Sequence, residues 1–249
     1  MTVLTPEVRV LVGKEIRQLL RSRGALITSL ILPVILLVVV PAAQYFSLSA
    51  ARTGVRGLAS GLAPPGLAGL RPTGVVTYYL VPMFTALAGV VMPSATAIYT
   101  IVQERERKTV ELLIALPVRV TDIVYAKLAA TLLVAAAIML PLVLVQVGAA
   151  LVVGAAGPGW AAGELLLLAC AIACSICFSF VLALLARDFR TSQQLNGFLV
   201  LPILILVNGV LLGLPPAVKV PVLAALLLLT GAVVLTVAVR RLTFERYLS

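Results

Sequence analysis

Long apolar runs alternate with short polar segments along the chain. Several runs reach the roughly 20 residues that a helix needs to cross a hydrocarbon core about 30 Å thick. They lack the alternation of polar and apolar residues that is typical of strands in a membrane barrel. The pattern therefore predicts an all-α membrane protein with six transmembrane helices in a single domain, residues 1–249. The expected helices cover residues 25–48, 75–102, 122–153, 161–186, 193–213 and 217–239.

The N-terminal segment, residues 5–23, has a different pattern. Apolar residues such as Val8, Val12 and Ile16 recur at helical spacing on one side. This arrangement predicts an amphipathic helix that lies in the membrane interface rather than across it. The alternative is a solvated basic face that only orients the protein. The basic residues of the segment are Arg9, Lys14, Arg17, Arg21 and Arg23.

Composition and charge agree with a membrane protein. The chain is 62% hydrophobic and 11% charged, where soluble domains have about 45 to 50% apolar and about 25% charged residues. Its 19 basic and 9 acidic residues would suggest nucleic acid as the partner of a soluble protein. Here the expected outer loops hold few of the basic residues, as the positive-inside rule predicts. We therefore expect a multi-pass protein of the plasma (inner) membrane with both termini in the cytoplasm, bound to lipid and not to nucleic acid. The basic residues assigned to the outer loops are Arg52, Arg56, Arg71 and Lys219.

The residues needed for catalysis are not apparent. The chain has no histidine, and we expect no ionisable side chain inside the spans, with Glu164 near the outer end of the fourth helix. An intramembrane enzyme, a buried carboxylate ion path and a proton relay are therefore not favoured.

Polar residues inside the expected spans are candidates for contact with a transported molecule. Small polar side chains in membranes more often join helices than bind cargo. Cys170, Cys174 and Cys177 share one helix face, where they either hold a soft metal ion or pack as small side chains; we expect packing and no metal site. The candidates for the substrate path are Tyr79, Thr85, Ser94, Gln146 and Asn208.

Charged residues are concentrated between the second and third expected spans, in residues 103–120. This stretch has no glycine or serine, and its first proline is Pro117, so it favours a helix. Glu104, Arg107 and Glu111 share one face, and Val110, Leu113 and Ile114 give a second, apolar side. Such a helix either rests on lipid headgroups or docks into a groove on a soluble partner.

The stretch "ERERKTVELLIALPVRVTDIVYAKL" resembles the segment that marks permeases of the ABC type-2 transporter family. Its matches to the family pattern include Glu104, Glu106, Thr109, Glu111, Pro117, Val118 and Lys127. Its departures are Lys108 for a glycine, Val110 for a leucine, Leu116 for a threonine and Ala126 for a second glycine. The resemblance implies that this segment is the cytoplasmic coupling helix, which fits a cleft on a separate ATPase. The coupling residues that it implies are Glu104, Glu106, Arg107, Thr109, Val110, Glu111, Leu112, Leu113, Ile114 and Pro117.

The resemblance also implies the partners and the mechanism. Two ATP-binding cassette ATPase subunits carry the ATP and Mg²⁺, and a second permease copy or a homologue completes a transporter that exports its substrate by alternating access. The chain lacks the phosphate-binding motif G-x-x-x-x-G-K-[ST], so we expect neither enzymatic activity nor a cofactor in it. Its short connection between the last two spans resembles the compact branch that includes sodium-extrusion and copper-site-maturation permeases. The alternative function is a membrane anchor or sensor that recruits a soluble ATPase without transporting cargo.

Overall fold

The computed structural model describes residues 12–14, 16–17, 30–44, 70, 72–106, 120–152, 154–185 and 189–241. In this part of the chain there are helices and short turns but no strand. Five of the described helices are long and apolar enough to cross a membrane, and a shorter apolar helix covers Leu30–Gln44. The all-helical fold class is thus confirmed for these ranges, and the full six-helix layout stays a prediction.

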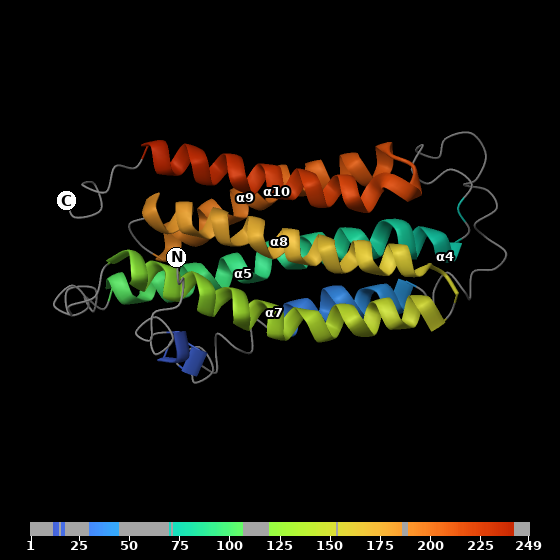
Figure 1. Ribbon diagram of the computed structural model, residues 1–249, viewed down its shortest axis with the longest axis horizontal. Coiled ribbons are helices and arrows are strands. Elements are labelled where there is room, and N and C mark those ends of the chain that lie inside the picture. The colour runs from blue at the N-terminus through green and yellow to red at the C-terminus, as the bar shows by residue number, and fades with distance from the viewer. Residues whose placement is uncertain are drawn as a thin grey trace.

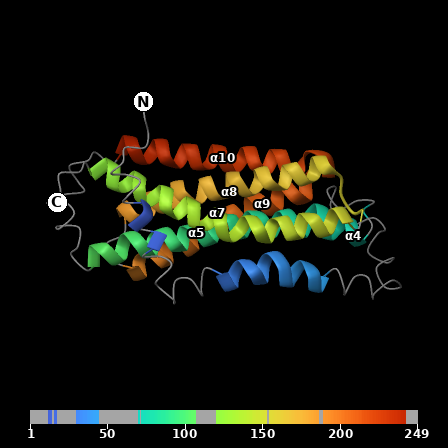
Figure 2. The same cartoon turned by 60° about the horizontal axis from the view of Figure 1, so that its bottom comes forward.

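The long helices run side by side along one axis (Figure 1). One continuous helix consists of α4 (Pro72–Val75), η3 (Val76–Leu80) and α5 (Val81–Glu106), where η3 is a π-helical segment. The others are α7 (Val120–Val152), α8 (Pro158–Leu185), α9 (Phe189–Gly213) and α10 (Pro216–Arg241). The helix Leu30–Gln44, which contains the π-helical segment η1 (Ile35–Val39), lies along the edge of the bundle beside α5 and α7 (Figure 2).

Helix α8 occupies the centre of the bundle. It packs most extensively on α5 and α10 and also contacts α7 and α9. Most of its membrane-spanning part is buried, whereas α9 exposes large apolar side chains such as Phe198 and Ile205. Outward apolar side chains are expected of helices that face lipid.

The helix bounds show why the chain turns where it does. After α7, Gly154 has a positive φ of 68°, and its N–H donates to the Leu151 carbonyl at 3.0 Å. A left-handed glycine closes a helix in this way, and Pro158 is well suited to the first position of the next one because its N–H is not needed there.

The connection between α9 and α10 is shorter than the sequence suggested. Only Leu214 and Pro215 separate the two helices. Lys219, which we assigned to an outer loop, lies in the first turns of α10 and is buried. That loop assignment was wrong because Lys219 belongs to α10, which begins at Pro216, and its ammonium contacts the Tyr78 carbonyl of η3.

Small residues let α8 approach its two main neighbours closely. A Cβ atom added at Gly89 of α5 would lie 2.6 Å from the Ala171 Cβ of α8. One added at Gly231 of α10 would lie 3.0 Å from the Cα of Cys174. These contacts leave no room for a larger side chain and make α5, α8 and α10 one tightly packed unit.

Candidate transport site

A polar contact joins α10 to η3, the π-helical segment just before α5. Pro82 has no N–H, so the carbonyl of Tyr78, four residues earlier, loses its α-helical partner. The Lys219 ammonium of α10 donates a hydrogen bond to this carbonyl with an Nζ to O distance of 3.4 Å. Neighbouring helices commonly satisfy backbone groups that a proline frees inside a membrane.

A carboxyl group is buried beside the same helices. Glu164, in the second turn of α8, has an exposed fraction of 0%, as does Lys219. The Thr85 hydroxyl of α5 faces the Glu164 carboxyl. Neither Glu164 oxygen nor the Thr85 oxygen meets the geometry of a hydrogen bond to any described residue. Glu164 lies near the end of its helix, as expected, but its burial was not predicted, because helix packing covers residues near the helix ends as well as those at the middle.

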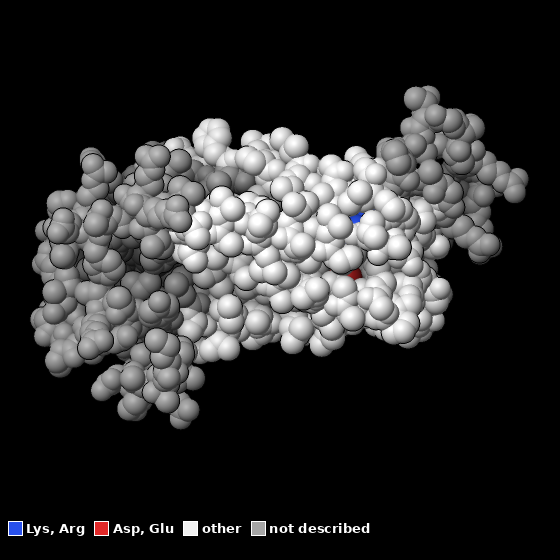
Figure 3. Space-filling view, turned by 45° about the horizontal axis from the view of Figure 1, so that its top comes forward, with Lys and Arg blue, Asp and Glu red and all other residues white. Residues whose placement is uncertain are grey.

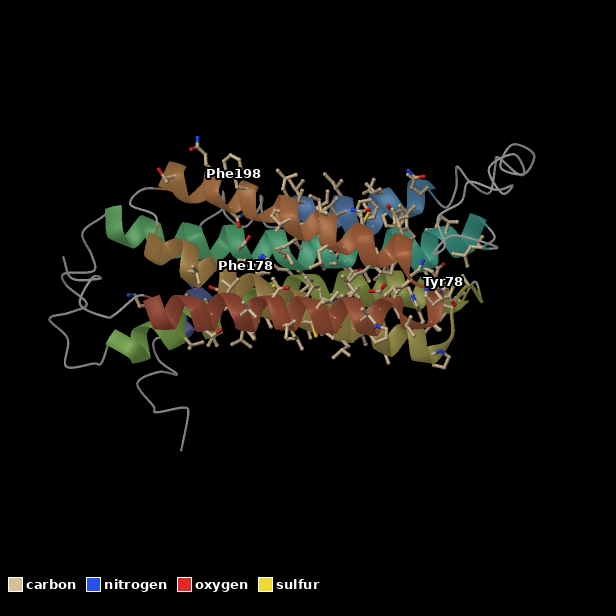
Figure 4. All side chains as sticks on the ribbon, turned by 90° about the horizontal axis from the view of Figure 1, so that it is seen from above. Tyr78, Phe178 and Phe198 are labelled. Atoms are coloured by element: carbon tan, nitrogen blue, oxygen red, sulfur yellow. The ribbon has the colours of Figure 1, made fainter. Side chains whose placement is uncertain are left out.

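Two aromatic residues lie at the same end of these helices. We call the group the Glu164 cluster, which consists of Tyr78, Thr85, Trp160, Glu164 and Lys219. The rings of Tyr78 and Trp160 meet edge to face with centroids 6.3 Å apart. Trp160 lies one turn before Glu164 on α8, and its indole N–H has no partner among the described residues. Figure 4 shows Tyr78 toward one end of the bundle, among side chains from neighbouring helices.

The described surface of the bundle carries almost no charge. In the space-filling view the described face is almost entirely white, with only small spots of blue and red (Figure 3). A charged group in this apolar setting is costly to retain and is therefore a candidate for function.

The residues predicted for the substrate path do not converge on one site. The Tyr79 hydroxyl donates to the Asn208 side-chain oxygen of α9 at 2.7 Å, and Thr85 belongs to the Glu164 cluster. Ser94 donates to the Val91 carbonyl of its own helix at 2.8 Å. Gln146 of α7 is buried, and its amide has no hydrogen-bond partner among the described residues. The cargo role of these residues stays a prediction. Sequence reasoning left out Glu164, Lys219 and Trp160, because nothing in the sequence shows which helix faces meet.

Two of the three cysteines on α8 lie in the packed core. Cys170 and Cys174 are buried, and Cys174 lies against Gly231 of α10. Within the described ranges, no three His, Cys, Asp or Glu side chains are grouped so that they could hold a metal ion.

The comparison with protein families decides the membership of the chain. Residues 9–243 match the model of the ABC-2 family transporter protein. The chain belongs to this family. No curated protein and no solved structure matches the chain significantly.

Membership makes this ABC-2 protein a multi-pass membrane permease of an ABC transporter. The family is a transmembrane component and implies association with ABC ATPase subunits. A membrane anchor that moves no cargo is not favoured by the match.

In this ABC-2 permease, most of the predicted coupling residues lie outside the described part. Glu104 and Glu106 belong to the last turns of α5, which ends at Glu106, and α7 begins at Val120. The rest of the coupling segment, from Arg107 through Pro117, is not described. The coupling role therefore stays a prediction.

The predicted interfacial helix is described only in part. Residues 12–14 and 16–17 are helical, with Lys14 and Arg17 exposed and Val12 and Ile16 partly buried. Arg9, Arg21 and Arg23 lie outside the described residues. The interfacial position of this segment stays a prediction.

Proposed function

We propose that this chain is the permease subunit of an ATP-driven exporter in the plasma (inner) membrane, with both termini in the cytoplasm. Two ATPase subunits bind ATP and Mg²⁺, and a second permease copy or a homologue completes the path for the cargo. The observation that carries this proposal is the family match over residues 9–243. The charged segment at residues 103–120 is the part that contacts the ATPase.

The arrangement of α5 supports a mechanical role for this segment. The helix formed by α4, η3 and α5 is continuous over residues 72–106, which at about 1.5 Å per residue is about 50 Å long. The C-terminal end of this helix leads into the coupling segment, and the part that holds Tyr78 and Thr85 belongs to the Glu164 cluster. Because Gly89 is packed tightly on Ala171, a displacement of α5 also displaces α8.

A hydrogen bond reinforces the contact between α5 and α8. The Ser175 hydroxyl of α8 donates to the Val90 carbonyl of α5 at 2.6 Å. Pro93 leaves the Gly89 carbonyl, not the Val90 carbonyl, without its α-helical donor, so the Ser175 bond is an additional link between the two helices. Closure of the ATPases thus moves α5 and α8 together. Closure can favour one of the two arrangements of the membrane helices only through contacts that differ between those arrangements.

Charge reversal in the coupling segment tests this function. We expect Glu111→Lys to abolish stimulation of ATP hydrolysis by the permease, because it replaces an acidic contact with a basic one. The measurement is ATP hydrolysis by the ATPase that copurifies with the tagged full chain from its native membrane, reconstituted in lipid vesicles. Membrane insertion of the variant is measured in parallel and should equal that of the wild type.

Arg56→Glu is the matched control, because it reverses one charge on the side expected to face away from the ATPase. This variant should hydrolyse ATP as the wild type does. Wild-type hydrolysis by Glu111→Lys would contradict the assignment of the coupling segment. Copurification of no ATPase with the wild-type chain would contradict the proposed function itself.

A further inference from the structure

The Glu164 carboxyl is buried without an internal partner. Its side chain has an exposed fraction of 0%, and neither Oε1 nor Oε2 has a hydrogen-bond partner in the described part of the chain. Lys219 of α10, at the same end of the bundle, donates a hydrogen bond to the Tyr78 carbonyl. Glu164 therefore differs from other buried polar residues such as Ser175 and Ser179, whose hydroxyls donate to backbone carbonyls.

The Thr85 hydroxyl is the second buried group that points to a ligand. It faces the Glu164 carboxyl, is fully buried and has no hydrogen-bond partner of its own among the described residues. Three oxygen atoms from α5 and α8 thus face one another in an apolar setting. All three can accept a hydrogen bond, and only the Thr85 hydroxyl carries a proton to donate, so a ligand that supplies another donor or a positive charge would satisfy the carboxyl.

A proton fits this arrangement better than a metal ion. An ionised carboxylate in a protein interior costs several kcal/mol even after relaxation, whereas a protonated carboxyl is neutral and carries its own donor. A cation such as Ca²⁺ takes about six to eight oxygen ligands. Glu164 and Thr85 supply three, and no metal-ligand group is found in the described ranges.

We propose that Glu164 is a proton-binding site, which holds its proton while α5, α8 and α10 are packed together and releases it when these helices separate. An exposed glutamic acid ionises well below neutral pH, so water that reaches the carboxyl removes the proton. The bond that breaks is the carboxyl O–H, and the proton passes to water. Binding of the proton requires neither ATP nor cargo and is independent of the proposed function.

The direction of the pH effect follows from linkage. The packed arrangement binds one proton more than the separated one, so acid favours packing and alkaline conditions favour separation. The other charged or titratable side chains at this end of the packed helices are Lys219 of α10 and Tyr78 and Tyr79 of η3. In the packed arrangement Lys219 donates a hydrogen bond to the Tyr78 carbonyl.

Infrared spectroscopy of the full chain in lipid nanodiscs tests the proposal. A protonated carboxyl has a C=O stretching band that an ionised carboxylate lacks. At neutral pH the wild type should show this band, Glu164→Gln should lose it, and Glu7→Gln, a matched change in the N-terminal segment, should keep it. A wild type without the band, or a band that survives in Glu164→Gln, would overturn the proposal.

Two further measurements keep the test decisive. Thr85→Val should shift the frequency of the band without removing it, because the hydroxyl that faces the carboxyl is lost. If Glu164→Gln does not fold, Thr85→Val still tests the proposal. A band at the wild-type frequency in Thr85→Val would argue against the site. Adding sodium or calcium chloride at constant pH should leave the wild-type band intact; its disappearance would mean that a metal ion, not a proton, is the ligand.

Discussion

At the scale of single residues, a backbone defect explains the buried lysine. Pro82 removes the N–H that would satisfy the Tyr78 carbonyl, and Lys219 from another helix donates to that carbonyl instead. An unsatisfied buried carbonyl costs about 1 to 3 kcal/mol. The long apolar stem of lysine can lie along the neighbouring helix while its ammonium reaches the polar group.

We expect Lys219→Met to destabilise the folded chain and expect Pro82→Ala to reduce that effect. Alanine at position 82 restores an N–H to the helix, so the Tyr78 carbonyl depends less on Lys219. Lys219→Met should lower the free energy of unfolding by about 1 kcal/mol more in the wild-type chain than in Pro82→Ala. This difference is the typical net value of one hydrogen bond. The measurement is SDS-induced unfolding of the full chain in micelles for both single variants and the double variant. Equal costs in both backgrounds would show that the two residues are not coupled.

The sequence could not reveal this residue-scale network. The two prolines at Pro215 and Pro216 favour a turn, and that turn is present, but the sequence does not show that Lys219, near the start of the next helix, is buried. Glu164 was correctly placed near a helix end, yet its complete burial depends on the faces that α5 and α10 present to α8. Such contacts between distant segments have no local pattern.

At the scale of helices, small residues determine how closely α5 and α8 approach. We expect Gly89→Ala to destabilise the chain by about 1 to 3 kcal/mol, since its new Cβ would meet the Ala171 Cβ at 2.6 Å and overpacked cores lose that much. The double variant Gly89→Ala with Ala171→Gly should recover most of the loss because it removes the opposing methyl group. The same SDS unfolding assay measures all three proteins.

Gly209→Ala of α9 is the matched control. An added Cβ at Gly209 meets no atom within 4 Å, so this variant should be as stable as the wild type or slightly more stable, because alanine favours helix more than glycine does. If Gly89→Ala were no more destabilising than Gly209→Ala, the close approach of α5 and α8 would not limit the side chain at position 89.

Helices were the part of the fold that the sequence predicted best. The apolar runs at 122–153 and 161–186 correspond to α7, Val120–Val152, and α8, Pro158–Leu185. The apolar composition of each run indicates a membrane helix directly, because lipid demands a long apolar segment with its backbone satisfied internally. The π-helical segments η1 and η3 were not predicted, since a single extra residue in a helical turn leaves no periodic signal over so short a length.

At the scale of the whole molecule, α8 links the candidate coupling segment to the proposed proton site. The long helix that ends at Glu106 packs on α8 through Gly89, and α8 carries Glu164 between α5 and α10. A displacement at the coupling segment thus reaches the helices that cover the carboxyl. If both proposals hold, opening of this end of the bundle requires loss of the Glu164 proton.

The resulting prediction concerns the pH on the membrane side opposite to the ATPase. In vesicles that hold the reconstituted complex, we expect acidification of that side alone to slow ATP hydrolysis by the wild type, because the proton stabilises the packed helices. Glu164→Gln resembles the protonated state permanently, so its hydrolysis should be slow and independent of that pH, while Glu7→Gln should keep the wild-type profile. ATP hydrolysis measured at fixed pH on the ATPase side separates this effect from the pH dependence of the ATPase itself. A wild-type pH profile in Glu164→Gln would show that the proton at this site is not linked to the transport cycle.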